Sequence, residues 1–364
     1  MKTLFMLLSA CGFAFSATAQ ILTEQDNNGS VTISPKGIKG STTSATSNSN
    51  VVLGPDAFIS NISGQSNTAV GQTSLYSNTT GNSNTALGAS ALYLNTSGNE
   101  NTAFGNAAMF LNTTGKGNTA TGFYTLSSNT TGNYNTATGQ YSLPTNTTGI
   151  GNTAYGNNTL DINKTGSNNT AVGSYAGQNI RSGSNNTFLG YDTGAALLGD
   201  SSLTNAAALG YNAKVNASNK IRIGNDQITV IEGQVNWSVP SDGRLKENIV
   251  YSSQLGLNFI SRLKPATYYY KTDKKKTSYN GFIAQDVAQA VTDLGGEFSG
   301  LKISNDGTYS IAYADFVMPL VNAVKELKGQ NEELKAQNEK LNQRLTKLEE
   351  LMSKITTSKT GSDK

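Results

Sequence analysis

"NTALGASALYLNTSGNE", residues 84–100, is one unit of a repeat that decides the fold of this chain. Its five-residue opening returns every 17 residues, from "NTAVG" at Asn67 to "NTFLG" at Asn186, and "NVVLG" at Asn50 is a weaker first copy. Each of these five-residue stretches ends in Gly, and a Leu or Met usually follows four residues later. An Asn then precedes a second turn that ends in Gly. Such a fixed period is typical of a repeat architecture.

One unit is too small to form a core, because it offers only a short apolar stretch and one Leu. The units must therefore stack, and short strands between Gly- and Asn-rich turns favour a β-solenoid over helices. We expect the Asn columns to form hydrogen-bonded ladders and the chain to make an extra turn around the Leu. A disordered linker is the alternative interpretation, but a linker would not keep an apolar column in register.

The "NTAxG" openings of residues 50–215 resemble the head repeats of trimeric autotransporter adhesins. The resemblance implies left-handed parallel β-rolls, with three chains packed about one axis. No acid or base recurs with the period, so a repeated catalytic or calcium site is not expected. A spacer is the simplest interpretation of the head, although its Thr columns also suit a carbohydrate or ice surface.

The residue types exclude most familiar catalytic sites. Among 364 residues there is no His, and the single Cys is Cys11, so His-based triads, His-ligated metals and disulfides are ruled out. We therefore expect neither a cofactor nor a metal. The net charge of +3 is small for this length and gives no reason to expect nucleic acid as a partner.

The chain begins with a predicted signal peptide, residues 1–19, in which Lys2 precedes an apolar run and Ala17-Thr18-Ala19 marks the cleavage point. It predicts a secreted or cell-surface protein. "LSAC", ending at Cys11, is an alternative lipoprotein signal. A linker follows at residues 20–49, and no later stretch is apolar enough to span a membrane.

The C-terminal part predicts a coiled coil over residues 320–356, followed by a polar tail at 357–364. Residues at a and d repeat every seven positions, with two Asn at a that fix the register. Its length is roughly 50 Å. A lone surface helix is disfavoured by the strict period, so the seam must face partner helices. The d positions are Leu320, Leu327, Leu334, Leu341, Leu348 and Ile355, and the a positions are Val324, Asn331, Asn338, Leu345 and Met352.

Two further regions connect the head to the coil. Residues 216–240, around "NKIRIGNDQITVIEG", predict a β-rich neck, and residues 241–330 predict a small α+β domain. Within that domain we expect a helix that ends before Pro265, a strand running into a helix near Ala284, and a last strand that leads into the coil.

Three motifs of residues 240–340 resemble the intramolecular chaperone domain of phage tail spikes and endosialidases, peptidase family S74. They are "SDGRLKENI", "GFIAQDVAQAV" and "YSIAYADFVMPLVNAVKEL", in this order. The resemblance implies trimerisation, assistance in folding the preceding fibre, and self-cleavage. It also implies Ser241 as nucleophile, Lys246 as base, and a cut between Pro240 and Ser241.

The chemistry of this pair can also be argued from the residue types alone. A serine hydroxyl needs a base, and in a chain without His a Lys is the natural candidate. The Lys must be neutral, which requires burial. A spacing of five aligns side chains on neither a helix nor a strand, so a bend at Asp242-Gly243 is required. A solvated turn is the alternative, and we expect Asp242 and Arg244 to form a structural ion pair.

The predicted fold is mainly β: a trimeric β-solenoid, then the small α+β chaperone domain and the coiled coil. The predicted function is a secreted homotrimeric fibre that cuts itself once per chain. Three alternatives stay open: a permanent, non-cleaving trimer clamp, an adhesin that binds a glycan or another cell-surface ligand, and an ice-binding solenoid. A membrane-anchored autotransporter is disfavoured, because the sequence ends in a coil and a polar tail.

Overall fold

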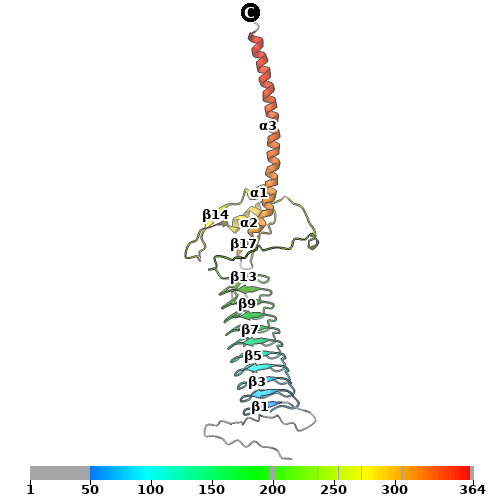
Figure 1. The fold of residues 1–364 in the computed structure, drawn as a ribbon, viewed down its shortest axis with the longest axis vertical. Coiled ribbons are helices and arrows are strands. Elements are labelled where there is room, and N and C mark those ends of the chain that lie inside the picture. Colours follow the sequence, from blue (N-terminus) through cyan, green and yellow to red (C-terminus); the bar gives the residue numbers. More distant parts are fainter. Residues whose placement is uncertain are drawn as a thin grey trace, which may run out of the picture.

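The computed structural model describes residues 50–196, 202–235, 237–252, 254–271, 273–304 and 307–360. It shows a column of stacked turns, a small α+β domain above it, and one long helix that leads away from both (Figure 1). The predicted signal peptide, the linker at 20–49 and the last four residues lie outside the described residues.

The column is a β-solenoid in which each turn adds one short parallel strand to an 11-stranded sheet. Consecutive strands pair in the register of the repeat, so Ala69 lies beside Ala86 and Ala86 beside Ala103. The strands are β1 (Val51–Leu53), β2 (Thr68–Val70), β3 (Thr85–Leu87), β4 (Thr102–Phe104), β5 (Thr119–Thr121), β6 (Thr136–Thr138), β7 (Thr153–Tyr155), β8 (Thr170–Val172), β9 (Thr187–Leu189), β11 (Ala207–Leu209) and β13 (Ile221–Ile223).

Two Asn columns form the predicted ladders through the interior. In the first, the side-chain amide of Asn84 donates to Asn67 Oδ1 at 3.1 Å and to the carbonyl of Gly98 at 2.8 Å. In the second, Asn95 donates to Asn78 Oδ1 at 2.7 Å. Because buried amides are costly unless they are hydrogen-bonded, these ladders require each turn to sit on the next.

The predicted extra turn around the Leu column is also present, and its backbone is unusual. Leu75, Leu92 and Leu126 are fully buried, yet each has a φ near +50°. A left-handed conformation costs about 1–2 kcal/mol for a residue with a Cβ, whereas burying a Leu contributes about 1.5–3 kcal/mol. Burial therefore outweighs the strain and points the side chain inward.

The glycines that close the strands have a steric reason. Gly122 has a φ of +133°, and a Cβ there would lie 2.7 Å from the carbonyl oxygen of Gly139 in the next turn. Both the backbone conformation and the spacing of the turns therefore require Gly.

We expect Gly122→Val to destabilise the solenoid by about 3 kcal/mol or more, because strain and a backbone clash add. Lys116→Val is the matched control, since that side chain is exposed and the backbone N–H of Lys116 keeps its bond to Asn133. Urea unfolding of the two variants measures the difference. Equal loss of stability would contradict the stacking of the turns.

The period breaks at the C-terminal end of the solenoid. Phe188 of β9 pairs with Ala208 of β11, twenty residues on, and Ala208 pairs with Arg222 of β13, fourteen residues on. A small parallel pair, β10 (Gly194–Ala195) and β12 (Lys214–Val215), lies within these last turns. Of the predicted β neck at 216–240, the only strand among the described residues is β13, and it continues the solenoid sheet.

The small domain combines two hairpins and two short helices around an aromatic core. Its elements are the 3-10 helix η1 (Gly243–Leu245), α1 (Leu257–Ile260), β14 (Pro265–Tyr268), β15 (Tyr279–Phe282), α2 (Ala284–Asp293), β16 (Leu301–Ile303), β17 (Tyr309–Ile311) and η2 (Tyr313–Phe316). Phe259, Phe298 and Phe316 meet in the core, with the rings of Phe298 and Phe316 4.7 Å apart.

The long helix α3 (Val317–Thr360) follows directly and covers the predicted coiled coil. It also extends into the first residues of the predicted polar tail. The mainly β class, the solenoid with its 17-residue spacing, the small domain and the long C-terminal helix are thus confirmed. The association of three chains stays a prediction.

Candidate active site

Ser241 and Lys246 lie together in the exposed segment that begins the small domain. Lys246 Nζ is 2.7 Å from Ser241 Oγ, within hydrogen-bond distance. The required bend is present: η1 occupies the residues between them, and Asp242 caps it by accepting from the backbone N–H of Arg244 at 2.9 Å. This short turn explains how side chains five residues apart can meet.

Asp242 and Arg244 form the expected ion pair. The Arg244 guanidinium donates to both carboxylate oxygens of Asp242, at 3.1 Å to Oδ1 and 2.5 Å to Oδ2. The side-chain and backbone hydrogen bonds from Arg244 lower the pKa of the Asp242 carboxyl. Asp242 is therefore engaged in holding the turn and is not directed at the Ser-Lys pair.

The pair is exposed in the single chain. Every described residue from Asp226 to Ser252 is exposed, including both members of the pair. A lysine that acts as a base must be shielded from water. One chain thus supplies the contact between the two groups but not the enclosure that the chemistry requires.

The segment that follows the pair is tied to the long helix. Glu326 of α3 accepts a hydrogen bond at 2.9 Å from the backbone N–H of Leu257, at the start of α1. Asn322 of α3 donates to the carbonyl of Ser252 at 3.2 Å. The sequence gives no signal for these contacts, because their partners lie about 70 residues apart. These two hydrogen bonds hold the segment that follows Lys246, at Ser252 and Leu257, against α3.

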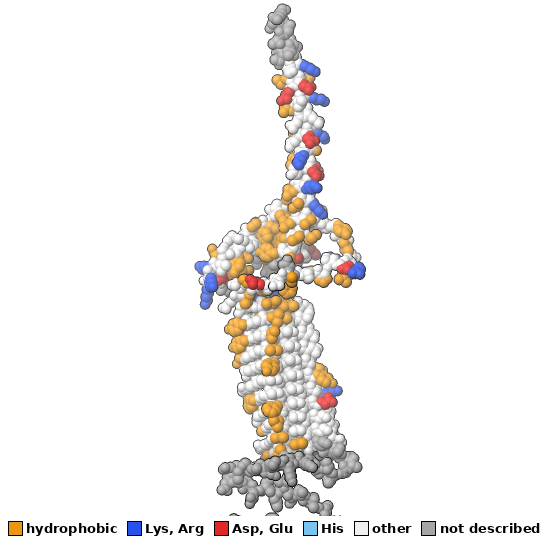
Figure 2. All heavy atoms as spheres, in the orientation of Figure 1, with side chains coloured by type: hydrophobic (Ala, Val, Ile, Leu, Met, Phe, Trp, Pro, Cys, Tyr) orange, Lys and Arg blue, Asp and Glu red, His pale blue; other side chains and the backbone are white. Residues whose placement is uncertain are grey.

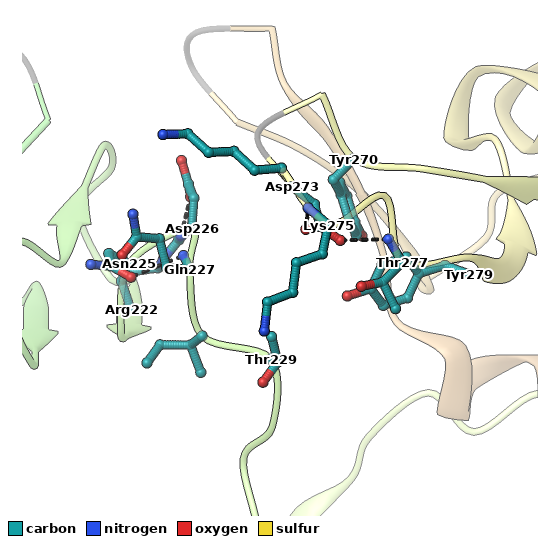
Figure 3. Close-up of a pocket in the computed structure, with 12 residues that line it drawn as sticks. Arg222, Asn225, Asp226, Gln227, Thr229, Tyr270, Asp273, Lys275, Thr277 and Tyr279 are labelled. Atoms are coloured by element: carbon teal, nitrogen blue, oxygen red, sulfur yellow. Dashed lines mark hydrogen bonds and ion pairs between the residues drawn. The ribbon is translucent and has the colours of Figure 1, made fainter.

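An open cleft of about 750 Å³ lies apart from this pair, between the end of the solenoid and the loop after β14. Figure 3 shows its two walls, with Arg222, Asn225 and Asp226 on one and Tyr270, Asp273, Thr277 and Tyr279 on the other. Its carboxylates are already paired. Asp226 binds Arg222 at 2.5 Å, and Asp273 accepts from two backbone N–H groups at 2.8 Å. Neither carboxylate of the cleft is therefore free of local hydrogen bonds or ion pairs.

The described part of the chain shows neither a metal-binding cluster nor an apolar helix of membrane-spanning length. No group of three or more Asp, Glu, His or Cys side chains there could hold a metal ion. Within the same residues, no helix is long and apolar enough to cross a membrane.

Residues 241–296 match the family model of Peptidase_S74, described as the chaperone of endosialidase. The match begins at Ser241 and ends shortly after α2, so it is shorter than the resemblance seen in the sequence motifs. No curated protein matches the chain. The chain thus combines a β-solenoid with a segment, residues 241–296, that is similar to the chaperone of endosialidase.

Proposed function

We propose that this chain is a secreted homotrimeric fibre whose chaperone domain aligns three chains, assists their folding, and then cuts each chain once between Pro240 and Ser241. The observation that carries the proposal is the 2.7 Å contact between Ser241 and Lys246 at the first residue of the family match. The family description supports the chaperone role, and the residue types support the cut.

The solenoid supplies a physical reason for a chaperone. Its turns are nearly identical in sequence and hydrogen bonding, so chains that associate one turn out of register lose few contacts. A domain that joins the three C-terminal ends first would remove this ambiguity. Release of the domain would then leave the trimer kinetically trapped.

The long helix supports association. Its d-position leucines are about half exposed in the single chain, and so are Val324 and Leu345 at a. Figure 2 shows apolar side chains among charged ones along the helix. An apolar seam of this length in water is typical of a surface that binds partner helices. The d-position residues concerned are Leu320, Leu327, Leu334, Leu341 and Leu348.

The proposed reaction uses one serine, one lysine and one water. Neutral Lys246 Nζ takes the proton of Ser241 Oγ as the oxygen bonds to the carbonyl carbon of Pro240. The C–N bond between Pro240 and Ser241 then breaks, and the proton passes to the freed amine of Ser241. Water hydrolyses the resulting ester, which gives a carboxylate at Pro240 and restores the hydroxyl. Each chain reacts once, so turnover of added peptides is not expected.

The purified protein tests this proposal directly. We expect light scattering to give three chains per particle, and a denaturing gel to separate two fragments, the second of which begins Ser241-Asp242-Gly243. An intact chain in a trimer would instead favour a permanent clamp that does not cleave. The exposure of the Ser-Lys pair in one chain is an observation that favours this alternative. A monomer at micromolar concentration would overturn the proposal.

An adhesin that binds a glycan or another cell-surface ligand is a second candidate function, favoured by an aromatic cluster on the solenoid. Phe123, Tyr124 and Tyr141 lie together with ring centroids 4.5–5.9 Å apart, and each is partly exposed. Such rings offer large contact area at little entropic cost. A test of glycan binding by the intact fibre would decide whether the solenoid is only a spacer or also binds a ligand.

A further inference from the structure

The segment before the candidate cleavage site, residues 231–239, has the sequence pattern of a strand, yet none of its described residues lies in a strand. Apolar residues alternate with polar ones: Ile231, Val235, Trp237 and Val239 fall on one side, and Glu232, Gln234, Asn236 and Ser238 on the other. Such alternation is typical of a strand with one buried face. No strand occurs among the described residues of this segment.

The apolar side of the segment is almost fully exposed. Val235 is 85% exposed, Trp237 89% and Val239 83%. Large apolar side chains that are this exposed to water are of the kind that binds another protein surface. We call Ile231, Val235, Trp237 and Val239 the neck face.

We propose that the neck faces of three copies of this chain pack against one another around the trimer axis, and that this contact encloses the Ser241–Lys246 pair. The inference rests on the proposed homotrimer. A second copy fits better than another partner, because like apolar residues meet well at a symmetry axis. The segment also carries a single charge, Glu232, so it offers nothing for a charged partner to recognise.

Two features of the chain place the copies of this segment together. In the proposed trimer the seam of α3 would bring three helices into register, and α3 is hydrogen-bonded to Ser252 and Leu257, which follow the pair in the chain. The neck face ends at Val239, directly before the candidate scissile bond. Packing of the neck faces would therefore cover a site that one chain leaves open to water.

The single Trp of the chain makes the contact measurable. In full-length Ser241→Ala protein, we expect Trp237 emission to be blue-shifted and several-fold less quenched by acrylamide than in a monomeric coil variant. The fraction of Leu334→Asp, Leu341→Asp protein that light scattering shows to be monomeric supplies this reference. If light scattering shows a trimer but Trp237 still emits like a water-exposed indole, the inference is overturned while the proposed trimer stands.

Cross-linking provides a second readout that does not depend on cleavage or on Trp. In a Cys11→Ser, Ser241→Ala background the introduced thiol is the only one. We expect Val235→Cys to give cross-linked chains with a short bis-maleimide, and Gln234→Cys, on the opposite side, to stay single. Equal cross-linking of the two variants in a trimer would contradict the neck face, whereas absence of a trimer would overturn both proposals.

Discussion

Ser241→Ala is expected to leave every chain intact between Pro240 and Ser241 while the particle remains a trimer. The reason is that the hydroxyl 2.7 Å from Lys246 Nζ is the proposed attacking group, and Ala has none. The measurement is a denaturing gel with N-terminal sequencing, beside light scattering of the same sample. A fragment that still begins at residue 241 would exclude Ser241 as nucleophile.

Lys246 is expected to matter almost as much, for a different reason. Loss of a general base slows a reaction by about 10²–10⁴-fold, so Lys246→Ala should cut slowly or not at all. Lys246→Arg should not restore the cut, because Arg keeps its proton.

Lys264→Ala is the matched control, because Lys264 is an exposed lysine of the same domain. It should cut at the parent rate. If Lys246→Ala also cuts at the parent rate, Lys246 is an ordinary surface lysine and the dyad is wrong. If the parent chain is itself intact, the domain is a clamp without peptidase activity.

Replacing Leu334 and Leu341 together by Asp is expected to abolish trimer assembly. Both lie at d on α3, so a trimer would bring six carboxylates into two apolar layers. Burying an unpaired charge costs several kcal/mol, and these costs add along one seam. We expect light scattering to give monomers or aggregates, and cleavage to be lost with the trimer.

Ala336→Asp with Gln343→Asp is the matched control, because these residues lie seven apart on the outer side of the same helix. It adds the same number of carboxylates without placing them in the seam. It should assemble and cut like the parent. Equal loss of assembly in the two variants would show that helix stability, rather than the seam, was affected.

The two experiments separate the parts of the proposed function. Loss of cleavage in an intact trimer locates the chemistry at Ser241. Loss of both assembly and cleavage in the coil variant would mean that enclosure of the site depends on the other chains. Cleavage by a monomer would show that the single chain shields Lys246 by itself.

Regular local signals in the sequence determined most of the fold. The 17-residue period places every strand from β1 to β9, because each turn repeats the same Asn and Gly positions. The seven-residue period predicts α3, and Asp242-Gly243 predicts the bend that joins Ser241 to Lys246. All of these depend on residues close together in the chain or on exact repetition.

Other features were decided only by the tertiary structure. The left-handed backbone of Leu75 and Leu126 follows from burial under the next turn, which no local propensity favours. The ladder that starts at Asn61 ends with Asn163 Oδ1 lacking a partner, because Ile180 occupies the next place in the column. The last turns change length where the repeat stops.

The setting of the candidate site also depends on the tertiary structure. Hydrogen bonds join Asn322 to Ser252 and Glu326 to Leu257, in the segment that follows Lys246. The partners lie about 70 residues apart in the sequence, and no spacing rule connects such pairs. The exposure of the Ser-Lys pair is likewise a property of how a single chain packs. The sequence determined which groups could react, because reactivity follows from residue type and short spacing. Their exposure to water was decided by the tertiary structure, in which no distant part of the described chain covers Ser241 or Lys246.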